Sequence, residues 1–195
     1  MTVRIPLVIV LAASVARAGP TEGEMIDEIT IHPRSERAEQ YAILFIARIN
    51  QTGTLDEVTG WVDRMLAMPR LLYGRPKLVS HLQNLQVRGR YQRARIAEAE
   101  ATRAKDAVAL HAACDAFLAS AALARQHAPT SELRLTALAD EATYNAGICY
   151  LAAGDPVAGL RHLSVVASDE LAWLGWRRIV TTVVRAPYAW LIDRT

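Results

Sequence analysis

The chain has 195 residues, 52% of them hydrophobic and 6% aromatic, with a formal net charge of +2. This length favours a single domain, and this apolar fraction is ample for a hydrophobic core. Arg4 and Arg17 lie in the first eighteen residues, which contain no acid; without them the 22 basic side chains fall to 20 and equal the 20 acidic ones. Such a balance argues against nucleic-acid binding or anionic-membrane binding as the main task.

The N-terminal sequence predicts a secretory signal peptide over residues 1–18. Arg4 precedes an apolar stretch, 7–15, of signal-peptide length, and Ala16 and Ala18 are the small residues that a signal peptidase requires. A retained membrane anchor is the alternative, but a spanning helix needs about 20 apolar residues and Pro20 follows too early. We therefore expect cleavage after Ala18 and a periplasmic or secreted protein with no stable membrane span in its mature part.

The next residues, 19–33, are expected to be a flexible leader. Pro20, Gly23 and Pro33 occur among charged side chains, and no hydrophobic periodicity is sustained there. From residue 34 onward the composition changes, because alanine and leucine dominate and β-branched residues do not alternate with polar ones. Residues 34–195 therefore predict one all-α domain.

The first two helices of that domain have clear start signals. Ser35 can cap a helix that begins at Glu36, and Thr54 with Glu57 forms a capping box for the next one. Gly53 lies in the short polar turn between them, so the two helices are expected to form an antiparallel hairpin.

The rest of the chain predicts further antiparallel helices. Residues 77–126 are helical in pattern, but this length exceeds the usual globular range, so a break is expected near Lys105, with a second one near Gly89 as an alternative. The remaining helices are expected at 132–153, 157–167 and 170–184. Apolar residues around Trp190 are expected to cover the open end of the resulting stack.

The two cysteines, Cys114 and Cys149, would lie in an oxidising compartment if the protein is exported. If their helices form a hairpin that bends at Pro129, the two positions are out of register by about 7.5 Å of helix rise. Such an offset is awkward for a disulfide, whose Cα atoms lie about 4.4–6.8 Å apart. Two buried free cysteines are therefore favoured, with a disulfide as the alternative.

One segment, residues 142–163, has a distinctive spacing of small and large side chains. Two glycines would let helix backbones approach, large residues would fill the adjoining space, and a Gly-Asp turn would reverse the chain. These positions are Asn145, Gly147, Tyr150, Gly154, Asp155, Gly159 and Leu163. In this spacing the segment resembles a tetratricopeptide repeat. It departs from the family at Thr143, where a large aromatic is usual, at Gly159, where alanine is usual, and in lacking the closing proline.

The resemblance implies a stack of helical hairpins whose inner surface holds a peptide or helix of a partner protein. Carried onto this sequence, it assigns that partner-binding surface to four positions of the first helix: Glu141, Tyr144, Ile148 and Leu151. The alternative is that these residues pack against neighbouring helices in a closed bundle, since only one repeat is convincing and about three are needed for a stable stack.

No familiar catalytic or metal-binding pattern occurs in the sequence. His111 and Cys114 have same-face helical spacing, but two ligands do not make a zinc site. Phosphate loops, zinc-protease motifs and serine-hydrolase motifs are all missing. We therefore expect no catalytic residue, no bound metal and no cofactor.

Three hypotheses for function follow. The leading one is an exported module that binds a protein or peptide partner. The second is an enzyme with a nonlocal active site, which predicts a cleft containing a carboxylate or histidine of strongly shifted pKa. The third is a structural subunit that self-associates through an apolar patch around Trp173, Trp176 and Trp190, although tryptophans are more often found in the core.

Overall fold

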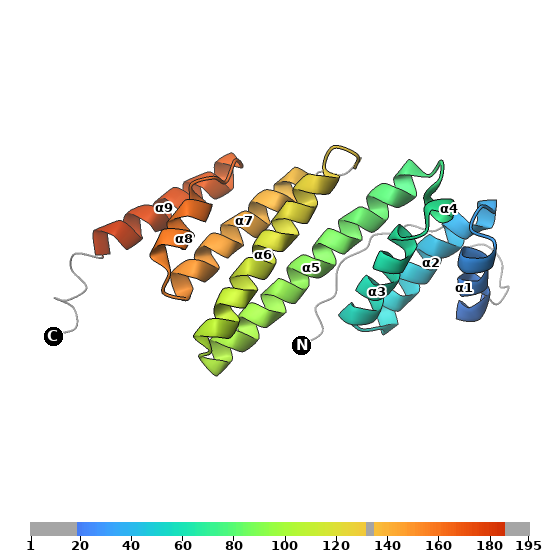
Figure 1. Ribbon diagram of the computed structural model, residues 1–195, viewed down its shortest axis with the longest axis horizontal. Coiled ribbons are helices and arrows are strands. Elements are labelled where there is room, and N and C mark those ends of the chain that lie inside the picture. Colours follow the sequence, from blue (N-terminus) through green and yellow to red (C-terminus); the bar gives the residue numbers. More distant parts are fainter. Residues whose placement is uncertain (1–18, 132–134, 186–195) are drawn as a thin grey trace. The chain divides into compact units, whose positions relative to one another are not determined.

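The computed structural model describes residues 19–131 and 135–185 of the chain. This part contains nine helices and no strand, and adjacent helices pack antiparallel (Figure 1), as the sequence predicts. In chain order the helices are α1 (Glu22–Ile31), α2 (Glu36–Thr52), α3 (Leu55–Leu66), α4 (Pro69–Leu72), α5 (Pro76–Ala104), α6 (Ala107–His127), α7 (Leu135–Ala152), α8 (Pro156–Leu163) and α9 (Asp169–Arg185). The predicted signal peptide and Trp190 lie outside the described residues.

The chain divides into two compact units, residues 1–86 and 87–195. Helix α5 contributes to both and is continuous through Gly89, so the alternative break there is wrong. The break near Lys105 is confirmed: this residue has φ 56 and separates α5 from α6. Asp106 then caps α6, because its carboxylate accepts hydrogen bonds from the backbone N–H groups of Val108 and Ala109.

Unit 1 is built on the predicted hairpin of α2 and α3. The Ser35 hydroxyl caps α2 by accepting a hydrogen bond from the Ala38 N–H, and Thr54 forms the expected capping box with Glu57 at α3. The apolar faces of these helices meet in a core that includes Phe45, whose ring packs edge-on against Trp61 at 4.8 Å between centroids.

The predicted flexible leader is wrong, because residues 22–31 form helix α1. Thr21 and Glu24 make a capping box at its start, and Met25 and Ile29 are fully buried in the core of unit 1. The missed signal is the Thr-x-x-Glu spacing itself, which is typical of a helix N-terminus. So short a helix shows little hydrophobic periodicity in its sequence. Burial of two apolar side chains is nevertheless enough to hold α1 against the core of unit 1.

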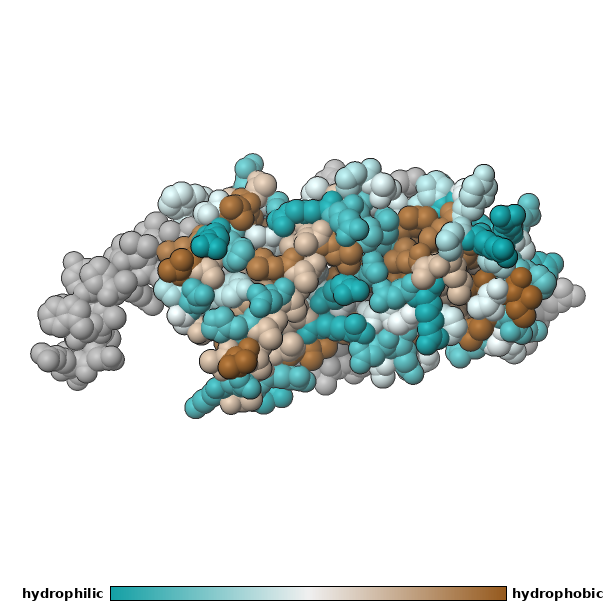
Figure 2. Space-filling view, viewed as in Figure 1, coloured by the Kyte–Doolittle hydropathy of each residue, from teal (hydrophilic) through white to brown (hydrophobic). Residues whose placement is uncertain are grey.

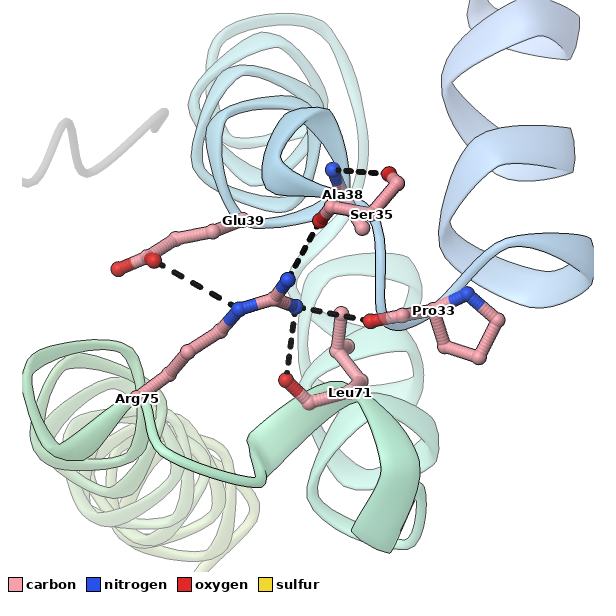
Figure 3. Close-up of polar contacts among 6 residues, drawn as sticks. All are labelled: Pro33, Ser35, Ala38, Glu39, Leu71 and Arg75. Atoms are coloured by element: carbon pink, nitrogen blue, oxygen red, sulfur yellow. Dashed lines mark hydrogen bonds and ion pairs between the residues drawn. The ribbon is translucent and has the colours of Figure 1, made fainter.

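Arg75 joins the connection between α1 and α2 to α2 and α4 of unit 1 (Figure 3). One guanidinium nitrogen, Nη1, donates hydrogen bonds to the carbonyl oxygens of Pro33 at 2.8 Å and Leu71 at 2.9 Å. Nη2 donates to the carbonyl oxygen of Ser35, and Nε lies 3.7 Å from a carboxylate oxygen of Glu39. The rigid fork of the guanidinium thus satisfies three backbone carbonyls at loops and helix ends, a role that lysine could not reproduce.

Unit 2 is a run of antiparallel helices in which α6 packs on α7 and α7 on α8 and α9. Phe117 of α6 is fully buried in its core, and its ring packs edge-on against Tyr91 of α5. The last helix has nearly the predicted bounds, whereas α8 ends at Leu163, four residues before the predicted end. Of α7, the predicted residues 132–134 lie outside the described part of the chain.

Among the described helices, α6 is long and apolar enough to span a membrane by length and composition alone. This is weak evidence for a span, because apolar core helices have the same composition. Cys114, Phe117 and Ala121 of α6 are almost fully buried within unit 2, as in a core helix.

Candidate functional site

The turn between α7 and α8 is formed by the Gly154-Asp155-Pro156 sequence, as expected. Gly154 has φ 83, a left-handed conformation that favours glycine, and the Asp155 N–H donates to the Tyr150 carbonyl at 2.9 Å. The Asp155 carboxylate then caps α8 by accepting from the Ala158 N–H at 3.0 Å, and Pro156 occupies the first helical position.

The two glycines of the repeat-like segment allow α7 and α8 to approach closely. A β-carbon at Gly147 would stand 2.7 Å from Leu163 Cγ, and one at Gly159 would stand 2.7 Å from Leu151 Cγ. Each glycine therefore receives a leucine of the opposite helix, so that the predicted roles of Gly147, Gly159 and Leu163 agree with this packing. The consequence is that any larger side chain at either glycine would push the hairpin apart.

Cys114 and Cys149 form a disulfide between α6 and α7, so the expectation of two free cysteines is wrong. Their Cα atoms lie 5.4 Å apart, and both side chains are fully buried. The error lies in placing the bend at Pro129: the bonded pair, Cys114 and Cys149, is centred in the sequence near Ser131, two residues later. About that midpoint the two cysteines are in register, well within the range a disulfide requires.

The four predicted partner-binding residues lie along one side of α7, but they are not equivalent. Glu141 is exposed, and Tyr144 and Ile148 are partly exposed. Leu151 is also partly exposed, but its side chain packs on Gly159 of α8. The accessible part of this surface, called the α7 face below, is therefore formed by Glu141, Tyr144 and Ile148.

A hydrogen-bonded cluster links the α7 face to α5. The Tyr91 hydroxyl donates to Glu141 Oε1 at 2.8 Å, and Asn145 Nδ2 donates to the Tyr91 hydroxyl oxygen at 2.8 Å. Asn145 also donates to the Glu141 carbonyl at 2.9 Å. Burial and the bond to Glu141 raise the pKa of Tyr91 well above its usual value, because both disfavour the phenolate. The cluster fixes the carboxylate of Glu141 and thus gives the α7 face one positioned negative charge.

Tyr150 is the centre of a second cluster, formed by α6, α7 and α8. Its hydroxyl donates to Asp115, its ring stacks on His162 at 5.5 Å between centroids, and it meets His111 edge-on at 5.9 Å. Burial raises the pKa of Tyr150 to about 12, with the hydrogen bond to Asp115 as a further cause. Burial lowers the pKa of His162, and the nearby Arg161 lowers it further, while Asp115 opposes both.

These groups can donate, accept and exchange protons, but they do not make a metal site. Within residues 19–131 and 135–185, no group of three or more His, Cys, Asp or Glu side chains is placed to hold a metal ion. Cys114, which shares a helix face with His111, is bound in the disulfide and does not offer a thiolate.

Thr143, at which the segment departs from the repeat resemblance, makes a polar contact between α6 and α7. It is nearly fully buried, and its hydroxyl accepts a hydrogen bond from Arg125 Nη2 at 2.7 Å and donates to the Ala139 carbonyl at 2.8 Å. The Arg125 guanidinium of α6 and the Thr143 hydroxyl thus join α6 to α7.

Hydrophilic and hydrophobic residues are interspersed on the face shown in Figure 2. Two shallow depressions of the described surface are considered next, and neither is lined by the predicted partner-binding residues. One, of about 620 Å³, lies in unit 1 beside Arg34 and Arg70. The other, of about 420 Å³, lies in unit 2 between the alanine-rich end of α5 and the start of α6.

The exposure of two tryptophans differs from the core position that is usual for this residue. Trp173 and Trp176 of α9 are each 63% exposed. The third tryptophan of the hypothetical self-association patch, Trp190, lies outside the described residues.

The sequence interpretation missed Tyr91, Asp115 and His162 as partners of the candidate residues. His111 and Asp115 are four residues apart on one helix, so their shared face was detectable. Tyr91 and Glu141 are fifty residues apart, and no local signal joins them. No family model, curated protein or solved structure matches this chain, so relatives supply no further site residues.

Proposed function

We propose that the protein is an exported helical-repeat module that binds a peptide or helix of a partner protein along the α7 face. In this proposal α7 and α8 correspond to one tetratricopeptide-like hairpin, with α5 and α6 as a degenerate neighbouring pair. The proposal rests on the resemblance of residues 142–163 and on the side chains that α7 leaves accessible.

The observation that carries the proposal is the combination of the close α7–α8 contact with an accessible, mixed surface beside it. Gly147 and Gly159 bring the two helices together, while Tyr144 and Ile148 remain partly exposed. Glu141 adds a carboxylate held by Tyr91. A partly exposed tyrosine and isoleucine beside one positioned charge are suited to an amphipathic segment with a basic or amide group.

Export is supported by the covalent link between α6 and α7. Disulfides form and persist in oxidising compartments and are uncommon in reducing ones. The Cys114–Cys149 disulfide, which joins two fully buried side chains, therefore fits the signal peptide proposed for residues 1–18. The specific location, periplasmic or secreted, belongs to this proposal.

The test is affinity capture of the tagged protein from a cell-envelope fraction. A Tyr144→Ala, Ile148→Ser double variant removes the apolar part of the α7 face without touching the Gly147 contact. The control is Tyr73→Ser, because Tyr73 is an 82% exposed aromatic of unit 1. We expect a discrete partner with the unmodified protein and the control and loss of that partner with the double variant; equal capture by all three would overturn the proposal.

The enzymatic alternative is a second proposal, favoured by one observation. Tyr150, Asp115 and His162 bring a phenol, a carboxylate and an imidazole of lowered pKa together at one end of α7. General acid–base chemistry needs such groups near a substrate. A captured partner that the unmodified protein alters chemically over time, and that a folded His162→Gln variant still captures but leaves unaltered, would favour the enzyme over the binding module.

A further inference from the structure

Helix α9 presents two large apolar side chains to solvent. Trp173 and Trp176 are each 63% exposed, and Leu174 between them is 37% exposed. Exposed tryptophans one turn apart are uncommon on a protein surface that has no partner. This part of α9, residues 170–177, is called the tryptophan face below.

The side of α9 that contacts the rest of unit 2 is a different one. Gly175 is buried, and a β-carbon there would stand 3.4 Å from the Leu163 carbonyl oxygen. At 3.6 residues per turn, Trp173 and Trp176 lie roughly 100–160° around the helix from Gly175. The tryptophan face is therefore directed away from the contact with Leu163.

Opposite charges flank the tryptophan face symmetrically. Glu170 and Arg177 are both exposed. They are seven residues apart, so they differ by only about 20° around the helix and by about 10.5 Å along it. Trp173 and Trp176 lie between them, which places one negative and one positive group at the two ends of a short apolar patch.

We propose that a second copy of this chain docks on the tryptophan face, with the two α9 helices antiparallel across a two-fold axis. In this arrangement the two α9 helices run in opposite directions. When the axis passes at the level between Trp173 and Leu174, Glu170 of each copy lies opposite Arg177 of the other. The same operation brings the four tryptophans together in the centre. A two-fold contact is self-complementary in this way by definition, whereas a parallel pairing would set like charges against each other.

The available area indicates a weak dimer. A tryptophan side chain buries about 150–250 Å², so four that are mostly exposed offer roughly 400–600 Å². Specific interfaces bury about 1,200–2,000 Å² in total, and transient ones less. The tryptophans would supply the buried centre, and the flanking residues the polar rim. This inference does not depend on the α7 face, so either can fail without the other.

The first test is sedimentation equilibrium of the purified protein over a wide concentration range. We expect a monomer–dimer equilibrium in the micromolar range, shifted toward monomer by at least tenfold in a Trp173→Ser, Trp176→Ser variant. Tyr73→Ser, which removes an exposed aromatic from unit 1, is the matched control and should leave the equilibrium unchanged. Because all three side chains are exposed, each variant should keep its helical circular dichroism.

The second test uses charge exchange between copies. Glu170→Lys alone and Arg177→Glu alone should each weaken self-association, because each sets like charges opposite one another. An equimolar mixture of the two single variants should form a heterodimer at least as readily as the original protein forms a homodimer, because every flanking pair is then opposite in charge. High salt should reduce this difference.

Three results on self-association would overturn the proposal. They are a monomer at every concentration, a dimer that the tryptophan substitutions do not weaken, and single charge variants whose mixture associates no better than either alone. Retention of the monomer on anionic phospholipid vesicles, lost in the double tryptophan variant, would assign the same face to a membrane surface and would equally contradict the dimer.

Discussion

Gly147 and Gly159 face each other across the contact of α7 with α8. A β-carbon at Gly147 would stand 3.1 Å from the Gly159 carbonyl oxygen, and one at Gly159 would stand 3.0 Å from the Gly147 carbonyl oxygen. The contact is reciprocal. At each glycine, a β-carbon would clash with both a leucine side chain and a backbone carbonyl oxygen of the opposite helix.

This contact predicts that alanine is destabilising at both glycines. Gly147→Ala and Gly159→Ala should each lower the free energy of unfolding by about 1–3 kcal/mol through overpacking. Gly60→Ala in α3 is the control, because no atom lies within 4 Å of its β-carbon position, and alanine should there add about 0.5–1 kcal/mol. Chemical denaturation measures all three; stabilisation at Gly147 would show that the helices are farther apart.

The disulfide predicts a large loss of stability when it is removed. The bridged cysteines are separated by 35 residues, for which loop-closure entropy gives about 2–4 kcal/mol. Cys114→Ala should cost nearly as much as the double alanine variant, since either removes the bridge. Denaturation curves test the energy, and alkylation of the denatured protein followed by mass measurement tests the bond: two alkylated thiols in exported protein would contradict it.

Arg75 predicts that a conservative substitution is costly in unit 1. Arg75→Lys should lower the free energy of unfolding by about 1.5–3 kcal/mol, because one ammonium group cannot satisfy the carbonyls of Pro33, Ser35 and Leu71 together. Glu39→Gln should cost less than about 1 kcal/mol, since this ion pair is long and its carboxylate is 35% exposed. Equal effects of the two substitutions would mean that the ion pair, and not the carbonyl contacts, holds Arg75.

The buried tyrosines predict a loss of stability at alkaline pH. The pKa of Tyr150 is raised to about 12 and that of Tyr91 is also raised, whereas both are near 10 in an unfolded chain. The folded state therefore keeps its phenolic protons when the unfolded state loses them, and stability should fall as pH rises above 10. Tyr150→Phe should reduce this dependence, as measured by unfolding at pH 9 to 11.5; an unchanged slope would place the Tyr150 hydroxyl in water.

The local signals of the sequence were sufficient for most of the helices. Ser35, Thr54 and the Gly154-Asp155 turn act at short range, so capping and turn chemistry place them without knowledge of the fold. Thr21 and Glu24 also have capping-box spacing, but the nearby proline and glycine residues favoured the prediction of a flexible leader. Local rules failed there because a ten-residue helix is too short to show a clear hydrophobic pattern.

The candidate site was less accessible to sequence reasoning, because it depends on register between helices. A shift of two residues in the bend between α6 and α7 decides whether Cys114 and Cys149 can bond. The contact of Tyr91 with Glu141 and the stacking of His162 on Tyr150 depend on the same register. For Trp173 and Trp176 the sequence left both a core position and an exposed patch open, because average burial describes a residue type and not one position.

The most direct test of the proposed binding function is photo-crosslinking at the α7 face in the cell envelope. A photoreactive phenylalanine analogue replaces Tyr144 in one variant and Tyr73 in another, so that both probes are aromatic and one lies on each unit. A partner-binding surface on α7 predicts a discrete cross-linked adduct from position 144 and none of that size from position 73. No adduct at 144, or the same adduct from both positions, would contradict a partner-binding surface on α7.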